Sequence, residues 1–335
     1  MNKKLSFALL GGAALAVAMP STMLADTWRM SHKMPPESVE GELFQKFADE
    51  VEERTDGAIT FEVYPNEQLG SDDAVLEQIQ LGTVHVYPEG ITYLQRWVPE
   101  IAWAAAPFLF DDREHWVRFM NSDLVAEWLD KVEEEAGIVL IGDPTEFVRG
   151  PFRVMLSSEE FETLEEMQGI RLRMHPDELA AEAWRHLGAE VRTLAWTETY
   201  ESISRGIVDA VNSPIALAES MAFYEVAPHI VRHDEYSQGM AFMASATEWH
   251  ALDEETRQQV LEAYDAIAAE SQAVMGDIAD ESIESMQEKG ATYSEIDTSD
   301  FVARMLEMYE ELDAEGEMPE GFLETVEATR EAEGG

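Results

Sequence analysis

Apolar residues between positions 27 and 87 switch between the period of a strand and the period of a helix. Residues 27–32, 59–63 and 84–87 are short apolar or alternating runs, as in buried and half-buried strands. Residues 43–51 and 75–79 instead carry their apolar side chains on one helical face. Strands that alternate with helices in this way predict an α/β fold with mostly parallel sheets.

A second alternation of the same kind lies further along the chain. It begins with a short strand pattern that contains Arg171 and Arg173, followed by an amphipathic helix. A second strand ends at Trp196, and Thr197 is placed to cap a short helix after it. A third strand, residues 207–211, runs directly into an Asn-Ser-Pro sequence.

Polar side chains gather at the carboxyl ends of these strands. In an open α/β sheet, ligands bind just beyond the carboxyl ends of the strands. Arg173, Trp196, Asn212 and Ser213 all lie at or near such ends. A guanidinium fork, an indole face and two small polar groups suit a small carboxylate.

Some choices within this site stay open. Arg171 lies two residues before Arg173 and so shares its face of the strand, which means that strand geometry does not choose between them. Trp196 could cover the ligand or pack beneath the strand end. Tyr87 and Glu89 lie at the end of the strand at 84–87 in the first unit, and we expect them to line the opposite side of the cleft.

A long helical pattern at residues 252–287 follows the second unit. It exceeds the length of an ordinary globular helix, so it either spans two lobes or breaks, with Gly276 as the candidate position. We expect a first lobe at 26–150, a second lobe at 151–240, and a crossing segment, the long helix and C-terminal helices at 241–335.

The first 25 residues have the pattern of a secretory signal peptide. Lys3 and Lys4 precede an apolar run from Leu5 to Ala18, and the segment ends near Met23-Leu24-Ala25, where Met23 is bulky for its position before the cut. The run is short for a membrane span, although an uncleaved anchor is the alternative. We therefore expect cleavage, a periplasmic mature protein and no stable membrane insertion.

The composition is extremely acidic. The chain has 69 Asp and Glu residues against 22 Lys and Arg residues, a formal net charge of −47. Such charge destabilises a compact state unless salt screens it, so we expect a halophilic protein. It also argues against nucleic acid or an anionic membrane surface as a partner. There is no cysteine, so an exported form must be held by core packing without disulfides.

The sequence carries no familiar catalytic or metal-binding motif. G-x-S-x-G, H-E-x-x-H, a Walker loop and calcium-loop spacing are absent. His32 and His175 follow strands and could edge a cleft, but neither shows the positioned partner that acid–base chemistry needs. We expect no enzymatic activity, no cofactor and no metal.

Four stretches, in this order, are similar to those of a known family. They are DGAITFEVYPNEQLGSD from Asp56, APFLF from Ala106, GPFR from Gly150, and a long segment that runs from Gly169-x-Arg171-x-Arg173 through LGAEVRTLAWTETYESISRGIVDA to FYEVAP. The chain resembles the periplasmic solute-binding proteins of TRAP transporters, the DctP-type, from about Trp28 to Gly290.

The resemblance implies a periplasmic binding protein fold. In this family, two α/β lobes are bridged by crossing strands and a long helix, and the ligand sits in the cleft between the lobes. It also implies a function: capture of a small organic acid and its delivery to TRAP permease subunits, which use an ion gradient. We expect a monomer.

The resemblance further implies roles for single residues. Arg173 matches the family arginine that pairs with the ligand carboxylate, and Arg153 matches a second arginine that often helps, although Arg149 could take that role. Ser213 falls where many members have a ligand-contacting asparagine, and Asn212 falls one position earlier. This departure leaves the polar contact, and with it the ligand, open.

Two other function classes are alternatives. A periplasmic enzyme acting on an organic acid would have the same export signal and cleft. A sensor-accessory protein that reports ligand to a membrane kinase would bind the same solutes. Among ligands, a monocarboxylate, dicarboxylate, keto acid, sugar acid or ectoine-like solute all stay open.

Overall fold

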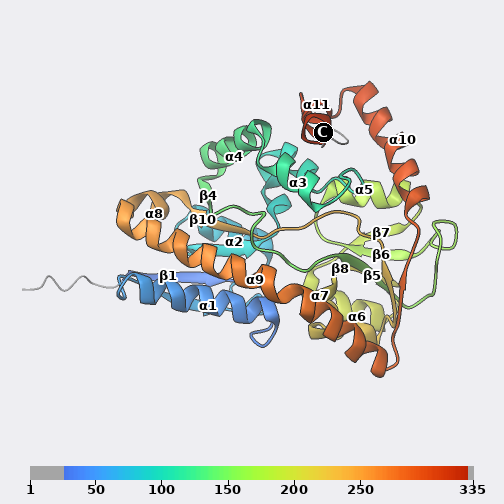
Figure 1. Ribbon diagram of the computed structural model, residues 1–335, viewed down its shortest axis with the longest axis horizontal. Helices are drawn as coiled ribbons and strands as arrows, with labels where there is room; N and C mark the ends of the chain where they lie inside the picture. Colours follow the sequence, from blue (N-terminus) through green and yellow to red (C-terminus); the bar gives the residue numbers. More distant parts are fainter. Residues whose placement is uncertain (1–25, 331–335) are drawn as a thin grey trace, which may run out of the picture.

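The computed structural model describes residues 26–330, so the predicted signal peptide at residues 1–25 lies outside the described part of the chain. The chain forms two α/β lobes, each built on one sheet (Figure 1). The first sheet has five strands in the order β2-β1-β3-β10-β4. The second has six, in the order β11-β9-β5-β8-β6-β7.

The elements follow the predicted alternation. The strands are β1 (Asp26–Ser31), β2 (Ile59–Tyr64), β3 (Val86–Glu89), β4 (Ile138–Ile141), β5 (Arg153–Ser157), β6 (Arg171–Met174), β7 (Glu190–Thr193), β8 (Ala210–Pro214), β9 (His229–Arg232), β10 (Ala241–Ser245) and β11 (Thr292–Glu295). The α-helices are α1 (Val39–Arg54), α2 (Asp72–Gln80), α3 (Arg113–Met120), α4 (Asp123–Ala136), α5 (Glu178–His186), α6 (Thr199–Ser204), α7 (Ile215–Ser220), α8 (Ala246–Ala251), α9 (Glu254–Glu288), α10 (Ser299–Glu315) and α11 (Phe322–Thr329). Four short 3-10 helices are η1 (Ile91–Arg96), η2 (Pro99–Ala105), η3 (Trp196–Glu198) and η4 (Phe223–Glu225).

Both sheets are mixed, whereas the sequence pattern predicted mostly parallel strands. β1 pairs in parallel with β2 and β3, and β6 pairs in parallel with β7 and β8. β10 is antiparallel to β3 and β4, and β5 is antiparallel to β8 and β9. The difference arises because β5 and β10 each enter their sheet from the other lobe.

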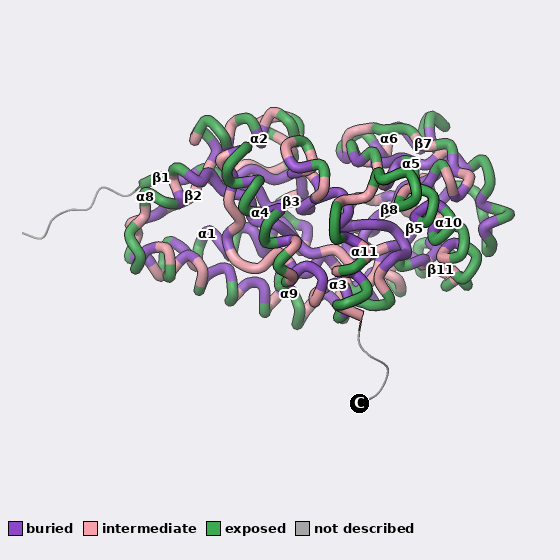
Figure 2. The backbone as a smooth tube through the Cα atoms, turned by 90° about the horizontal axis from the view of Figure 1, so that it is seen from above, coloured by how far each residue is buried: buried purple, intermediate pink, exposed green. Residues whose placement is uncertain are grey.

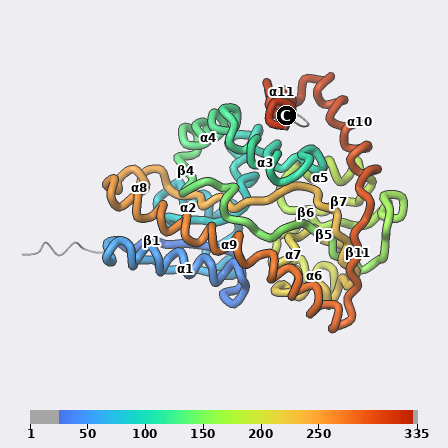
Figure 3. Tube along the Cα trace, viewed as in Figure 1, coloured from blue at the N-terminus to red at the C-terminus, as the bar shows by residue number. Residues whose placement is uncertain are grey.

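Two crossing segments, residues 142–152 and 233–240, carry the chain between the lobes and run side by side (Figure 3). Val148 and Gly239 form an antiparallel bridge between them. A Cβ at Gly239 would lie 1.8 Å from the carbonyl oxygen of Pro144, so only glycine fits there. Because the segments pack backbone to backbone, a change in the angle between the lobes must bend both.

Helix α9 joins the lobes a third time. Its 35 residues span about 52 Å at the usual rise of an α-helix. It packs against α1 of the first lobe and α7 of the second (Figure 1). The helix continues through Gly276 without a break, so of the two interpretations of the long pattern the continuous, lobe-spanning helix is correct.

The apolar core forms two layers, and each layer extends through both lobes. One contains Trp28 of β1 together with Met275 of α9, and the other contains Trp128 of α4 together with Trp184 of α5. Along β5 the side chains alternate between the two layers, as a strand buried on both faces requires. Buried backbone accordingly runs through the centre of the molecule (Figure 2).

The division of the chain at residues 150 and 240 stays a prediction of lobe boundaries. The first crossing segment lies between β4 and β5, and β10, which begins at Ala241, belongs to the first sheet. Between residues 26 and 330, no helix combines the length and apolar character that crossing a bilayer demands.

Candidate ligand-binding site

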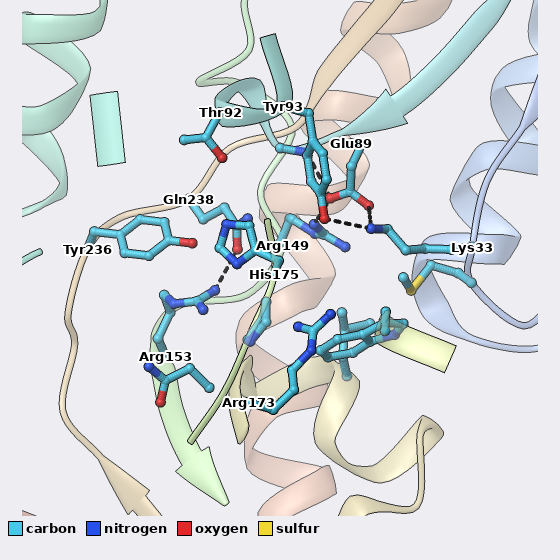
Figure 4. Close-up of a pocket in the computed structure, with 16 residues that line it drawn as sticks. Lys33, Glu89, Thr92, Tyr93, Arg149, Arg153, Arg173, His175, Tyr236 and Gln238 are labelled. Atoms are coloured by element: carbon cyan, nitrogen blue, oxygen red, sulfur yellow. Dashed lines mark hydrogen bonds and ion pairs between the residues drawn. The ribbon is translucent and has the colours of Figure 1, made fainter. Parts of the chain in front are cut away.

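A cavity of about 50 Å³ lies where the two lobes and both crossing segments meet (Figure 4). Its lining comes from the carboxyl ends of strands in both sheets, as expected for open α/β sheets. Lining residues include Lys33, Glu89 and Tyr93 from the first lobe, Arg173, Trp196 and Asn212 from the second, and Arg149, Arg153, Tyr236 and Gln238 from or next to the crossing segments. The volume is small beside the roughly 300–1,000 Å³ of pockets that enclose drug-sized ligands, so entry of such a ligand requires the lobes to separate.

Arg173 lies near the carboxyl end of β6 and is 4% exposed. Its Nε donates a hydrogen bond to the carbonyl oxygen of Leu194 at 2.9 Å, and its Cζ lies 5.3 Å from the centre of the Trp196 ring. No carboxylate of residues 26–330 lies within 4.0 Å of its guanidinium nitrogens. Burial lowers the pKa of Arg173, although nearby acids oppose the shift. The cleft therefore holds a buried cation that lacks a counter-ion.

Arg171 occupies a different environment at the start of the same strand. Its Nε donates to Asp209 at 2.8 Å, a second nitrogen contacts the other carboxylate oxygen, and Nη1 donates to the carbonyl of Gly206 at 2.6 Å. It does not line the cavity. The structure thus separates two arginines that strand geometry could not, and it brings Arg173 to the cavity.

Glu89 lies at the end of β3 and joins two of the lining cations. Lys33 Nζ lies 3.0 Å from one of its carboxylate oxygens and 2.8 Å from Asp72, and Arg149 donates to the other Glu89 oxygen. Burial alone would raise the pKa of Glu89, but Arg149 and Lys33 outweigh it and lower that pKa to about 2. Arg149 also binds Glu40 through two hydrogen bonds of 2.9 Å. Glu89 is therefore charged, buried and fully paired.

Arg153, at the start of β5, is paired as well. Its Nε donates to Glu235 at 2.7 Å, its Nη1 donates to the side-chain oxygen of Gln238 at 2.7 Å, and its Cζ lies 4.4 Å from the centre of the Tyr236 ring. Arg149 and Arg153 both line the cavity, so the structure brings both candidates for the second arginine to the site. Each already holds a protein carboxylate.

The Asn212 side chain belongs to the network around Glu235. Its amide nitrogen donates to Glu235 at 2.9 Å, and Trp184 Nε1 donates to the same carboxylate oxygen at 2.6 Å. His233 Nδ1 accepts a hydrogen bond from the backbone N–H of Glu235 at 3.2 Å, so its Nε2 carries the proton and donates to the Asn212 oxygen at 3.2 Å. Burial lowers the pKa of His233 to about 4. This network fixes one face of the cavity.

Two predicted site residues lie away from the cavity. Ser213 alternates with its neighbours along β8, so its side chain points to the other face of the sheet and donates to the carbonyl of Pro214 at 2.9 Å. The hydroxyl of Tyr87 donates to Asp72 instead of reaching the ligand cavity. Trp196 does line the cavity, and its Nε1 is buried with no hydrogen-bond partner in the described chain.

Several lining residues were missed by sequence reasoning. Lys33 follows β1 and could have been found by the same strand-end rule that identified Glu89. Tyr93 lies in η1, and Tyr236 and Gln238 lie in irregular backbone of the second crossing segment, where no periodicity marks a side of the chain. His175, which follows β6, lines the cavity, whereas His32 does not.

Contacts between the lobes surround the cavity. Thr197, predicted as a helix cap, instead donates its hydroxyl to Glu67 of the first lobe at 2.7 Å, and the residue before α6 is Glu198. Glu67 has a left-handed backbone with φ 56°. The rings of Tyr93 and His175 lie 5.8 Å apart between their centres. These contacts describe a closed cleft.

A second cavity, of about 270 Å³, adjoins the first. The wall between them is formed by the residues that both linings share, Arg149, Arg153, Pro214, Tyr236 and Gln238. A ligand too large for the first cavity can therefore extend only if this wall or the lobes move. Residues 26–330 contain no group of three or more His, Asp or Glu side chains that could hold a metal ion.

Comparison with known proteins agrees with this geometry. The family model described as bacterial extracellular solute-binding protein, family 7 (DctP), matches residues 30–315. A solute-binding protein of Chromohalobacter salexigens is 26% identical over 301 residues, 90% of this chain and 88% of its own. The C4-dicarboxylate-binding periplasmic protein DctP of Rhodobacter capsulatus is 24% identical over 295 residues, 87% of each chain.

A solved structure shows the same fold. A TRAP periplasmic solute-binding protein from Ochrobacterium anthropi, with bound L-fuconate, has a TM-score of 0.83 at 22% identity, covering 91% of this chain and 99% of that one. Fold and site together define a two-lobed binding protein with a cation buried in its cleft. The chain belongs to family 7 of the bacterial extracellular solute-binding proteins, the DctP type. It is a periplasmic solute-binding protein of the TRAP class, which confirms the resemblance seen in its sequence.

Proposed function

We propose that this protein captures a small organic acid by pairing its carboxylate with Arg173. The observation that carries the proposal is the guanidinium of Arg173, which is 4% exposed and has no carboxylate of residues 26–330 within 4.0 Å. Lys33, Arg149 and Arg153 line the same cavity but are each paired. A planar guanidinium binds a carboxylate through two parallel hydrogen bonds, so the ligand supplies the counter-ion that the protein lacks.

Closure of the cleft strengthens this pairing. Water leaves the site as the lobes approach, and an ion pair is stronger where the effective dielectric constant is low. The closed form is then selected because it binds the ligand better than the open form does. The ligands of two relatives support an acid: a C4-dicarboxylate for the Rhodobacter capsulatus protein and L-fuconate for the Ochrobacterium anthropi protein.

The captured acid is delivered to the membrane subunits of a TRAP permease, with this chain acting as a monomer. Family membership supports the transport role. Exchange of ligand requires the lobes to reopen. The two crossing segments and α9 must then bend, as must the C-terminal segment, which runs from β11 of the second sheet to α11 beside α3 and α4.

Mass spectrometry of ligand retained through gentle purification, followed by calorimetric titration of that compound, tests the proposal. We expect an organic acid that binds the native protein and loses its affinity in the Arg173→Ala variant. A retained ligand without any acidic group, or chemical conversion of the bound acid over time, would contradict capture for transport and favour an enzyme.

A further inference from the structure

The charged groups around the cavity are nearly balanced before any ligand enters. Four cationic side chains line it, and three contact buried carboxylates of the protein. Lys33 contacts Asp72 and Glu89, Arg149 contacts Glu40 and Glu89, and Arg153 contacts Glu235. Within residues 26–330, Arg173 is the lining Lys or Arg side chain with no carboxylate partner.

A second carboxylate on the ligand would find no free cation here. Removing a carboxylate from water is costly unless an opposite charge and hydrogen bonds replace the water. The lining cations other than Arg173 are already shared among four protein carboxylates, Glu40, Asp72, Glu89 and Glu235. A second ligand anion would therefore meet paired cations and the negative charge of their partners.

Neutral hydrogen-bonding groups complete the lining. Tyr93 accepts a hydrogen bond from Lys33 at 2.9 Å, so its own O–H proton is available to a ligand oxygen. Burial raises the pKa of Tyr93 to about 12, which keeps that proton in place at neutral pH. Tyr236 stacks on Arg153 through its ring, and burial raises the pKa of its hydroxyl as well. Thr92 adds a third hydroxyl to the cavity wall.

We infer that the ligand is a hydroxylated acid with a single carboxylate, and that the paired cluster Lys33–Glu89–Arg149 acts as the element that rejects dicarboxylates. The inference rests on the proposed function, because it takes Arg173 as the carboxylate partner. The hydroxyl groups of the ligand contact the neutral side of the cavity formed by Thr92, Tyr93 and Tyr236. A site built from hydrogen-bonding groups discriminates strongly against a ligand that leaves them, or its own charge, unpaired.

Matched pairs of acids test the inference by calorimetry on the native protein. L-galactonate and galactarate differ only in the oxidation of one terminal CH₂OH to a carboxylate, and D-glycerate and tartronate differ in the same way at a shorter length. Two lengths separate the effect of charge from that of size. In each pair of which a member binds, we expect the monoacid to bind at least tenfold more tightly than its diacid. A pair in which the diacid binds within tenfold of its monoacid, or more tightly, overturns the inference.

The Glu89→Gln variant tests the role of the cluster. Loss of this carboxylate leaves Lys33 and Arg149 with one carboxylate partner each. The ratio of monoacid affinity to diacid affinity should therefore fall by several fold. Glu53→Gln is the control: it also removes one negative charge, but Glu53 is exposed on α1 and contacts no Lys or Arg within the described residues. Its ratio of monoacid to diacid affinity should stay native. An unchanged ratio in Glu89→Gln overturns the cluster's role, and if that variant does not fold, the native ratios decide the ligand class.

Failure of the inference and failure of the proposed function are distinguishable. Binding of neither pair overturns the hydroxylated class. The proposed function then survives if pyruvate or succinate binds the native protein but not Arg173→Ala, and it fails if no carboxylate binds at all.

Discussion

At the scale of single residues, the environment rather than the residue type separates the arginines of this chain. Arg171 and Arg173 stand two positions apart on β6, yet Arg171 is neutralised by Asp209 and Arg173 is buried without an acid. Arg149 and Arg153 line the cavity but serve Glu40, Glu89 and Glu235. The lack of a carboxylate partner among the described residues is the feature for which we propose Arg173 as the ligand anchor.

Replacement of Arg173 should abolish most of the affinity. Arg173→Ala leaves the ligand carboxylate buried and unpaired, which should weaken binding by about 2–5 kcal/mol. Arg173→Lys should also bind poorly, because an ammonium cannot form two parallel hydrogen bonds. Calorimetry with the identified acid measures both. Arg171→Ala is the control, expected to retain affinity and to lose little folding stability, because its ion pair with Asp209 is open to solvent. Near-native affinity in a folded Arg173→Ala protein would remove this residue from the site.

His233 should make folding stability fall in mild acid. Its folded pKa is about 4, below the ordinary 6.5, because the ring is buried, with Arg153 adding to this and Glu235 and Asp234 opposing it. Between those values the unfolded chain binds a proton that the folded chain refuses, so stability decreases as the pH falls from about 6.5 towards 4. The loss from this residue should reach about 2 kcal/mol near pH 5.

Urea unfolding at about pH 7 and about pH 5 measures this loss of folding stability. Each unit of difference between the folded and unfolded pKa corresponds to about 1.36 kcal/mol. His233→Gln should lose less stability on acidification than the native protein does. His186→Gln replaces a surface histidine and should behave like the native chain. Equal losses in all three proteins would show that His233 does not carry the acid sensitivity.

At the scale of elements, hydrophobic periodicity predicted the helices and strands but not which strands come from the opposite lobe. The alternation of helices and strands and the length of α9 were visible because buried faces impose a repeat on the sequence. The direction of β5 and β10 in their sheets could not be predicted in this way, because it depends on the lobe from which each strand comes. Thr197 is a residue type that often caps helices, but its hydroxyl donates a hydrogen bond to Glu67 of the opposite lobe instead.

The candidate site divides in the same way. Strand-end reasoning located Arg173, Trp196, Asn212 and Glu89, because the carboxyl ends of strands can be inferred locally. The same reasoning, supported by the resemblance, also placed Ser213 in the site, but the alternation of β8 turns that side chain away. Tyr236 and Gln238 lie in a crossing segment, and their place in the cavity depends on a long-range pairing that no local pattern encodes.

Gly142 should be the most sensitive point where a crossing segment meets α9. Its φ is 73°, and a Cβ there would lie 2.1 Å from the Tyr264 ring. Gly142→Ala combines a left-handed backbone cost of about 1–2 kcal/mol with an overpacking cost of about 1–3 kcal/mol. Gly137→Ala is the matched control, because its φ is 63° but nothing lies within 4 Å of the added Cβ. Thermal melts should show a clearly larger loss for Gly142→Ala; equal losses would mean that Tyr264 moves aside freely.

At the scale of the whole molecule, two core layers run through both lobes, and the cleft lies between the two lobes. We therefore expect closure to bend connections that the two lobes share and not to join two independent domains. The Glu67–Thr197 hydrogen bond belongs to the closed form. Small-angle scattering should show a smaller radius of gyration with ligand than without it, and an unchanged radius at saturation would argue against closure.

The surface charge should make folding depend on salt. A formal net charge of −47 repels itself, and salt screens charges more than about 10 Å apart already at 0.1 M. We expect the melting temperature to rise by several degrees from low to molar salt. A midpoint that stays constant or falls along a sodium chloride series would contradict the halophilic character.

The unpaired guanidinium of Arg173 gives salt a second effect, opposite in sign to the first. A guanidinium without a counter-ion attracts any small anion that reaches the open cleft, and chloride is abundant in the same molar salt that favours the fold. Chloride and cargo then compete for one position, so affinity for the acid should fall as sodium chloride rises, even while the melting temperature climbs. Replacing chloride with a bulkier anion at equal ionic strength should restore much of the affinity. At molar sodium chloride, this binding protein would therefore have a lower affinity for its ligand and a higher folding stability.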